Sequence, residues 1–457
     1  MNIEIFIKNP PKNKFAEIYL KYQSLEKEET IVSLNISFKE LYMFTGQKTG
    51  LVLDLFLVSC LVYSIDILIP RSKYSFNGWA RDFDFVIPVE YPDIFNKYQN
   101  ELNHLLSFLT GDNWNISFKQ RDRFVLYVSA PRMKNYSKPF RESFKKISLF
   151  SGGLDSLIGA IDELNNSRDK IVLASHYDSV FKGPKSDQDK IITFLKKSYK
   201  NSFHLIQTRV DLSNVDVNGK KIEHETTLRS RSFLFLCHAV FISDSIKKNM
   251  PIFIPENGTI ALNYPLTPSR RSSLSTRTAH PYYLRKLTEY IYRLGITHDI
   301  INKYEMKTKG EMVEKCNDRD ILLQIYGQSC SCAKRGTRKD IWDNPSGINH
   351  CGICMPCIYR RVALNKINSD NENMGTDLFF PQKRDMENLP DIKAFIDYIS
   401  TNRSIEDIEK QLLANGSLSL DKLNDYAKVI YRTRKEIIAW IKQKGSDKIK
   451  KIAGLGS

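Results

Sequence analysis

The chain of 457 residues has no segment typical of export and few cysteines. Its opening stretch, MNIEIFIKNPPKNK, lacks the apolar core that a signal peptide requires. Eight residues are cysteine, and five of them fall between positions 330 and 357. A secreted disulfide framework would distribute its cysteines through a short chain instead. We therefore expect a reduced, cytoplasmic protein whose clustered cysteines bind a metal.

The chain also lacks internal repeats and an uninterrupted hydrophobic run of membrane-spanning length. One run, LVLDLFLVSCLVYSIDILIP at 51–70, is long enough to span, but Asp54 and Asp66 lie inside it. A carboxylate at the middle of a bilayer costs about 2.5–3.5 kcal/mol. We therefore expect a buried core helix here and no membrane association.

Composition and charge set wide limits on partners. Hydrophobic residues make up 42% of the chain and charged residues 26%, as in globular proteins with large cores. The length predicts two or three domains. The net charge of +16 permits an anionic partner such as a nucleic acid, a nucleotide or an acidic protein. A lysine-rich composition would give the same surplus without such a partner, so nucleic acid stays an open possibility.

Three regions follow one another along the chain. Residues 1–143 mix strand-like and helical runs, which predicts an α+β domain without a catalytic motif. Residues 144–368 alternate strands and helices, and residues 369–457 are helical and increasingly basic. In the first region we expect strands at 4–7, 30–38, 114–118 and 123–130 and helices at 47–68 and 93–109. The segment 130–146, which is polar and basic, predicts a linker or an edge connection.

The central region predicts a doubly wound parallel sheet, hence an α/β fold. Short apolar runs rich in β-branched residues are separated by helical stretches, and this order is typical of parallel sheets. The expected strands are 146–150, 170–177, 202–212 and 250–258. The expected helices run from the glycine turn to about 165, at 186–200 and at 227–246.

The sequence SGGLDS, residues 151–156, joins the first of these strands to its helix. Gly152 and Gly153 allow backbone conformations that bring N–H groups together, and the positive end of the next helix points at the same place. Ser151 and Ser156 add hydroxyl donors, while Asp155 beside an anion would hold Mg²⁺ or cap the turn. Neither G-x-x-x-x-G-K-[ST] nor G-x-G-x-x-G is present at this turn. The turn predicts a phosphate cradle of another kind.

The cysteines predict a closed metal site. Cys351, Cys354 and Cys357 form C-x-x-C-x-x-C, and either Cys330 or Cys332 supplies the fourth thiolate, with Cys330 placed first. Four thiolates are typical of a structural Zn²⁺ site, and an iron–sulfur cluster is the alternative.

The turn S-G-G-x-D-S resembles the pyrophosphate loop of the PP-loop ATP pyrophosphatases. Together with the cysteine site it resembles the QueC family, the 7-cyano-7-deazaguanine synthases. TKGEMV at 308–313 is similar to that family's T-K-x-E-I-V, and Arg360 follows Cys357 as in its C-x-x-R ending. Arg231 opens a helix where the family has Arg-Asn, and Gln188 is similar to a glutamine after its second strand. Leu157 and Ile158 depart from the Thr-Thr that usually follows the loop serine.

Residues 256–281, ENGTIALNYPLTPSRRSSLSTRTAHP, resemble the QueC-like proteins of bacterial anti-phage operons, the QatC group. This resemblance implies an ATP-dependent ligase that adenylates 7-carboxy-7-deazaguanine. It would then join the acyl group, as an amide, to the N-terminus of an operon-encoded, QatB-like partner protein. The domain 1–143 would dock that partner. The implied cofactors are ATP, Mg²⁺ and Zn²⁺.

The resemblance also implies roles for individual residues. ATP would be bound by Ser151, Gly152, Gly153, Leu154, Asp155, Ser156, His176 and Tyr177. The catalytic set would be Asp155, Lys309, Arg231, Arg270 and His280, with His280 as base for the incoming amine. Glu256, Asn263 and Arg270 would contact the deazaguanine. Three alternatives remain: a synthase that uses ammonia to make the free nitrile, a PP-loop tRNA-modifying enzyme, and a nucleotide-binding scaffold without activity.

Overall fold

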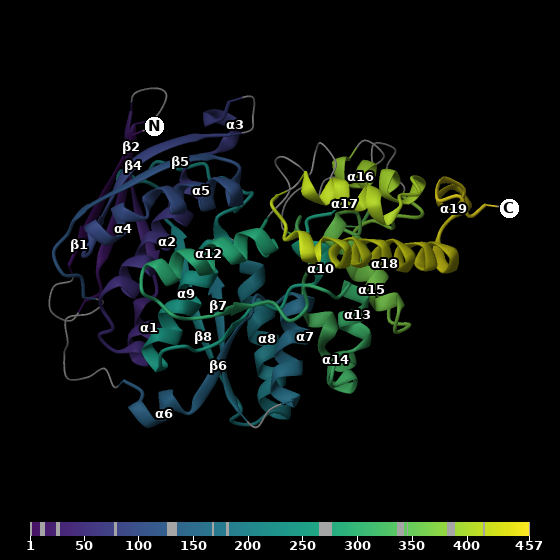
Figure 1. Cartoon of the computed structure of the whole chain (residues 1–457), viewed down its shortest axis with the longest axis horizontal. Helices are drawn as coiled ribbons and strands as arrows, with labels where there is room; N and C mark the ends of the chain where they lie inside the picture. The colour runs from purple at the N-terminus through teal and green to yellow at the C-terminus, as the bar shows by residue number, and fades with distance from the viewer. Residues whose placement is uncertain are drawn as a thin grey trace.

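A large, mostly parallel sheet runs through the protein (Figure 1). The computed structural model describes residues 2–9, 14–23, 28–76, 80–125, 135–166, 169–179, 182–264, 277–335, 342–344, 346–381, 389–414 and 416–456, and the statements below concern these residues. The strand order is β10-β9-β6-β7-β8-β3-β2-β1-β4-β5. The strands are β1 (Asn2–Lys8), β2 (Glu17–Gln23), β3 (Glu29–Ile36), β4 (Asp82–Val89), β5 (Asn113–Gln120), β6 (Phe144–Leu149), β7 (Lys170–Tyr177), β8 (Phe203–Leu212), β9 (Ile252–Phe253) and β10 (Ile300–Ile301).

The half of the sheet from β10 to β8 is entirely parallel, and helices cover both of its faces. Along β7, Ile171 and Leu173 join the core cluster formed with α7 (Leu154–Asn165) and α8 (Lys182–Ser198). Val172 and Ala174 join the cluster formed with α9 (Arg231–Ile246) on the other face. A strand that alternates its apolar side chains between two cores is typical of a parallel sheet buried on both sides. The expectation of a mixed α/β fold with a parallel sheet is confirmed.

The N-terminal strands continue this sheet. Strand β3 pairs antiparallel with β8, with Leu34 opposite Leu212, and β2 and β1 follow antiparallel before β4 and β5 return to parallel pairing. The sequence patterns missed β2 and β4. The expected strand at 123–130 is wrong in its described part, because 123–125 is not in a strand, and 126–130 lies outside the described residues.

Two further expectations are wrong: one predicted strand is shortened by flanking prolines, and one predicted helix is interrupted. The predicted strand 250–258 is reduced to β9, since Pro251 and Pro255 flank it and cannot donate to a ladder. The predicted helix 93–109 is divided at Tyr98 into α4 (Pro92–Lys97) and α5 (Gln99–Thr110). The segment 130–146 contains the short helix α6 (Lys138–Glu142) where it is described.

The hydrophobic run 51–70 forms α2 (Leu51–Leu68), a core helix as predicted. This is the one described helix long and apolar enough to cross a membrane, and 94% of it is buried inside the protein. Arg121 donates to Asp54 across 2.7 Å, and Arg81 and Ser230 donate to Asp66. Both carboxylates are therefore paired within the core, as buried charges must be.

Helices of the C-terminal part gather around α18 (Leu420–Lys444) and form a second core with the cysteine region (Figure 1). The remaining helices are α1 (Phe38–Thr45), α3 (Arg71–Tyr74), α10 (Gly258–Ala261), α12 (Pro281–Arg293), α13 (Lys309–Glu314), α14 (Arg319–Ile325), the 3-10 turn η1 (Tyr326–Gln328), α15 (Met355–Asn365), α16 (Pro390–Ser400), α17 (Ile405–Leu413) and α19 (Asp447–Ile452).

Candidate functional site

The glycine turn lies between the carboxyl end of β6 and the first turn of α7. The N–H of Gly152 donates to Ser156 Oγ at 3.1 Å, and the N–H of Gly153 donates to Ser151 Oγ at 3.3 Å. Ser151 Oγ in turn donates to Ser156 Oγ at 3.1 Å. The two serines and two glycines singled out from the sequence therefore converge at one place, with Ser151 exposed to solvent.

Gly152 is required by both conformation and space. Its φ is +86°, in the region that favours glycine, and a Cβ there would lie 3.2 Å from Gln188 Cγ. Gln188 supports the turn from α8, since its side-chain amide donates to the carbonyls of Ser151 and His176, both at 3.2 Å. Gln207 on β8 donates to Gln188 Oε1 at 2.8 Å and fixes its orientation. Gln188 was matched from the resemblance, whereas Gln207 was missed.

Asp155 is the centre of a buried polar cluster beside the turn. The ammonium of Lys309 pairs with Asp155 Oδ1, and Asn257 Nδ2 donates to Asp155 Oδ2 at 2.7 Å. Burial, the largest single influence, would raise the pKa of Asp155, but the charge of Lys309 together with hydrogen bonds from Glu256, Lys309 and Asn257 lowers it, so the carboxylate stays ionised. Burial and the adjacent Asp155 raise the pKa of Glu256 well above its ordinary value. Of the predicted residues, Asp155, Lys309 and Glu256 are thus brought together, and Asn257 was missed.

Lys309 is held by helix capping and by the C-terminal region. Thr308 and Glu311 form a reciprocal capping box at the start of α13, which places Lys309 in the first turn. From α18, Arg432 donates to Glu311 at 2.7 Å, and Thr308 Oγ1 donates to Glu436 at 2.6 Å. The capping pattern T-K-G-E is visible in the sequence, but its anchoring by α18 is not.

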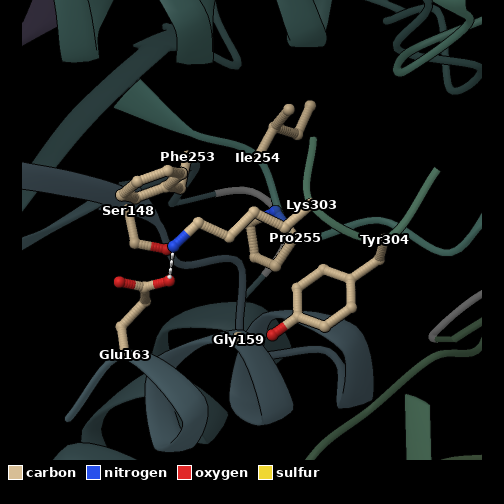
Figure 2. A pocket seen from close by; sticks show the side chains of 8 residues that line it. All are labelled: Ser148, Gly159, Glu163, Phe253, Ile254, Pro255, Lys303 and Tyr304. Atoms are coloured by element: carbon tan, nitrogen blue, oxygen red, sulfur yellow. Dashed lines mark hydrogen bonds and ion pairs between the residues drawn. The ribbon is translucent and has the colours of Figure 1, made fainter. Parts of the chain in front are cut away.

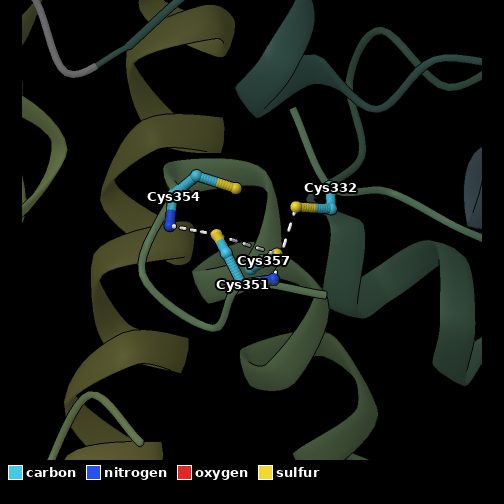
Figure 3. A group of neighbouring side chains, drawn as sticks. All are labelled: Cys332, Cys351, Cys354 and Cys357. Atoms are coloured by element: carbon cyan, nitrogen blue, oxygen red, sulfur yellow. Dashed lines mark hydrogen bonds between the residues drawn. The ribbon is translucent and has the colours of Figure 1, made fainter. Parts of the chain in front are cut away.

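Four cysteines form a candidate metal centre (Figure 3). The sulfurs of Cys332, Cys351, Cys354 and Cys357 all lie within 4.8 Å of one another. A tetrahedral ion with Zn–S bonds of about 2.3 Å holds its sulfurs about 3.8 Å apart, and the Cys351 and Cys357 sulfurs are 3.8 Å apart. The backbone N–H of Cys354 donates to Cys351 Sγ at 3.3 Å, which supports a thiolate there. The donor set fits zinc.

Cys330, placed first among the candidates for the fourth ligand, is not in this cluster; its alternative Cys332 is. Cys330 Sγ faces the carbonyl of Asn349 at 3.7 Å instead. Its backbone N–H donates to the carbonyl of Gly152 at 3.1 Å, so the residue lies against the glycine turn. Cys330 and Cys332 are two residues apart and would point to the same side of an extended segment, so their different placement shows that the backbone is not extended through both of them. Residues 329–332 have no regular secondary structure and a turn follows at 333–335, and the sequence does not reveal this path of the backbone.

Arg360, on α15, joins that helix to the loop that carries Cys330 and Cys332. Its fully buried guanidinium donates to Ser329 Oγ and to the carbonyl of Tyr326, both at 2.9 Å, and pairs with Glu372 at 2.5 Å. Arg360 therefore acts through the loop that carries Cys330 and Cys332, and it links the cysteine region to the glycine turn.

Two predicted ATP-binding residues, His176 and Tyr177, lie at the carboxyl end of β7, and Arg231 is the first residue of α9. His176 is buried between Tyr63 and Phe235, with ring centroids 5.3 and 5.4 Å away, and its Nε2 contacts the carbonyl of Val210 at 2.9 Å. Burial lowers the pKa of His176 well below its ordinary value, so the ring is neutral. Among the described hydrogen bonds, His176 is linked to the glycine turn through its backbone carbonyl alone, which accepts from Gln188, the residue that also donates to Ser151.

Tyr177 and Arg231 are each partly buried. The ammonium of Lys185 lies 5.4 Å from the Tyr177 ring. Arg231 stacks over Phe235 at 5.4 Å, and its Nε is buried without a hydrogen-bond partner in the described part of the chain. No described hydrogen bond or ion pair joins either side chain to Asp155 or Lys309.

His280, Asn263 and Arg270 are not brought to the Asp155 cluster by any described contact. His280 is buried as the N-cap of α12, where its Nδ1 accepts from Tyr282, and its ring packs 5.3 Å from Phe108. Burial lowers its pKa to about 3. These contacts indicate a structural role. Asn263 is buried with φ +55° and an unpartnered Nδ2 among the described residues, while Arg270 lies outside them.

A small cavity lies between residues of β6 and α7 and the segments 253–255 and 303–304 (Figure 2). It is lined by Ser148, Gly159, Glu163, Phe253, Ile254, Pro255, Lys303 and Tyr304, and its volume is about 10 Å³. Glu163 is neutralised by Lys303 and by Lys146, the latter at 2.6 Å. A space of this size holds at most about one water molecule, so it is not a substrate site.

The glycine turn, the Asp155–Lys309 pair and the cysteine cluster thus form one connected region at the carboxyl edge of the parallel strands, where ligands bind in open α/β sheets. Comparisons of the chain with protein-family models, with curated proteins and with solved structures find no match.

Proposed function

We propose that the chain is an AMP-forming ligase with a PP-loop type of ATP site. It adenylates the carboxylate of 7-carboxy-7-deazaguanine and joins the acyl group, as an amide, to the N-terminus of a partner protein in anti-phage defence. The observation that carries the proposal is the turn Ser-Gly-Gly-x-Asp-Ser at the end of a parallel strand, with Lys309 paired to Asp155 beside it. The substrate and partner rest on the resemblance of residues 256–281.

The chemistry needs two steps. A carboxylate oxygen of the substrate attacks the α-phosphorus of ATP, the bond to the bridging oxygen breaks, and pyrophosphate leaves. The amine nitrogen of the partner then attacks the acyl carbon, AMP leaves, and the nitrogen loses a proton. The first turn of α7 is suited to the pyrophosphate, because aligned backbone dipoles favour an anion there. The N–H groups of Gly152 and Gly153, which donate to Ser156 and Ser151 here, would turn to the pyrophosphate when it binds.

Asp155 and Lys309 have complementary parts in this scheme. Asp155 would hold Mg²⁺, which neutralises phosphate charge, and Lys309 would stabilise charge that develops during adenylation. The capping box and α18 keep Lys309 in place, so this part of the site is pre-organised. The cysteine cluster would hold Zn²⁺ in a structural role, since four protein thiolates leave no open position.

The N-terminal strands offer a surface for the partner. On β4 buried residues alternate with exposed ones, so that Asp82, Asp84 and Val86 face solvent. One face of this part of the sheet is therefore open, and we assign the docking of the partner to it.

The test is intact-protein mass spectrometry of the operon partner after co-expression with the wild-type chain or with Ser156→Ala. We expect a mass gain equal to the deazaguanine acyl group on the partner's N-terminus, absent with the variant. If the partner gains no mass while purified enzyme converts 7-carboxy-7-deazaguanine with ATP and ammonia, the chain is the small-molecule synthase instead. Absence of ATP turnover with every acceptor would support the scaffold.

A further inference from the structure

Arg335 lies beside the glycine turn, at the end of the loop that carries Cys330 and Cys332. Its guanidinium pairs with Asp187 on α8. Asp187 borders the turn itself, since a Cβ built on Gly152 would lie 3.6 Å from Asp187 Cβ. The side chain of Asp187 therefore lies between Arg335 and the proposed phosphate cradle, in contact with both.

The loop is anchored at three points within six residues. The N–H of Cys330 donates to the carbonyl of Gly152 at 3.1 Å, Cys332 belongs to the metal cluster, and Arg335 pairs with Asp187. The loop 330–335, which contributes Cys332 to the cysteine cluster, therefore fixes the Arg335 guanidinium relative to the glycine turn. A cation placed this way loses little side-chain entropy when an anion binds, because it is already ordered.

The charges at this edge require a cation. Asp187 is a buried carboxylate next to a turn proposed to hold phosphate, and two anions there would repel. Burial raises the pKa of Asp187, and Arg335 opposes that rise. A guanidinium has five N–H donors, and a carboxylate uses at most part of them, so others remain for a second anion.

We infer that Arg335 is a phosphate-binding residue of the ATP site, with its guanidinium shared between Asp187 and the terminal phosphates of ATP. The inference rests on the proposed function, because it needs ATP to bind at the glycine turn. It adds a residue that neither the sequence patterns nor the resemblance singled out.

The experiment is calorimetric titration of the full-length zinc-loaded protein with a non-hydrolysable ATP analogue and Mg²⁺, and separately with AMP. For Arg335→Ala we expect binding of the analogue to weaken roughly ten- to a hundredfold, the loss typical of a hydrogen bond to a charged group. AMP binding should be unchanged, because AMP lacks the terminal phosphates. The affinity of Arg335→Lys for the analogue should lie between those of the wild type and Arg335→Ala. Arg293→Ala, which removes an exposed arginine paired with Glu101, is the matched control.

Two results would overturn the inference: equal affinity of Arg335→Ala and wild type for the analogue, or full recovery of affinity in Asp187→Ala/Arg335→Ala. The second would mean that Arg335 merely neutralises Asp187. If Arg335→Ala does not fold, Arg335→Gln, which can still hydrogen-bond Asp187, carries the same comparison. A wild-type protein that binds no ATP analogue would instead refute the proposed function.

Discussion

Replacement of Cys332 by serine separates the two possible fourth ligands of the metal centre. Cys332 Sγ lies within 4.8 Å of the other three sulfurs, whereas Cys330 points to the carbonyl of Asn349. We therefore expect the protein to bind one Zn²⁺ per chain, Cys332→Ser to bind it much more weakly, and Cys330→Ser to bind it as wild type does.

The magnitude follows from the donor set. Structural zinc sites bind with an apparent 10–16 kcal/mol at neutral pH. If the four thiolates share this about equally, loss of one costs about 2.5–4 kcal/mol, or on the order of a hundredfold or more in affinity. Cys351, Cys354 and Cys357 are buried, and their thiolates would lie uncompensated in the core without an ion, so we expect Cys332→Ser to unfold at a lower temperature.

The assay is metal content by mass spectrometry after dialysis, followed by competition with a chromogenic chelator and thermal unfolding of the same samples. Cys330→Ser is the matched control, since it removes a thiol two residues away. Loss of zinc in Cys330→Ser with retention in Cys332→Ser would refute the assignment. An iron–sulfur absorption band in anaerobically purified protein would refute zinc itself.

Two further predictions concern the core and the Lys309 support. Burial raises the pKa of Asp54 to about 6, above its unfolded value of 3.8 despite Arg121, so the folded state binds the proton more tightly. The wild type should therefore lose stability relative to Asp54→Asn as pH rises from 4 to 6, by up to about 3 kcal/mol, in denaturant titrations at each pH; a difference independent of pH would contradict this. Thr308→Ala removes the cap of α13 and the bond to Glu436, and should cost about 1–2 kcal/mol of unfolding free energy and slow pyrophosphate release. Thr308→Ser should retain both, and equal rates in the two variants would show that Lys309 does not need this support.

The sequence by itself determined the local features. The strands β6, β7 and β8 and the helices α7, α8 and α9 lie where short apolar runs and helical periodicity predicted them. The glycine turn was identifiable because two adjacent glycines allow backbone conformations that other residues avoid, and the three cysteines because C-x-x-C-x-x-C is a spacing typical of metal ligands. Asp54 and Asp66 already argued that the hydrophobic run is a core helix.

Only the tertiary structure decided what lies together across long stretches of chain. The pairing of β3 with β8 in the middle of the sheet joins residues nearly two hundred positions apart, and the residues of a strand do not specify its partner. Asn257 and Lys309 meet Asp155, and α18 supports Thr308, because whole helices pack in one arrangement. The choice of Cys332 over Cys330 depends on the path of an irregular loop, and that path is set by its contacts with Gly152, Arg360 and the other cysteines rather than by local preference.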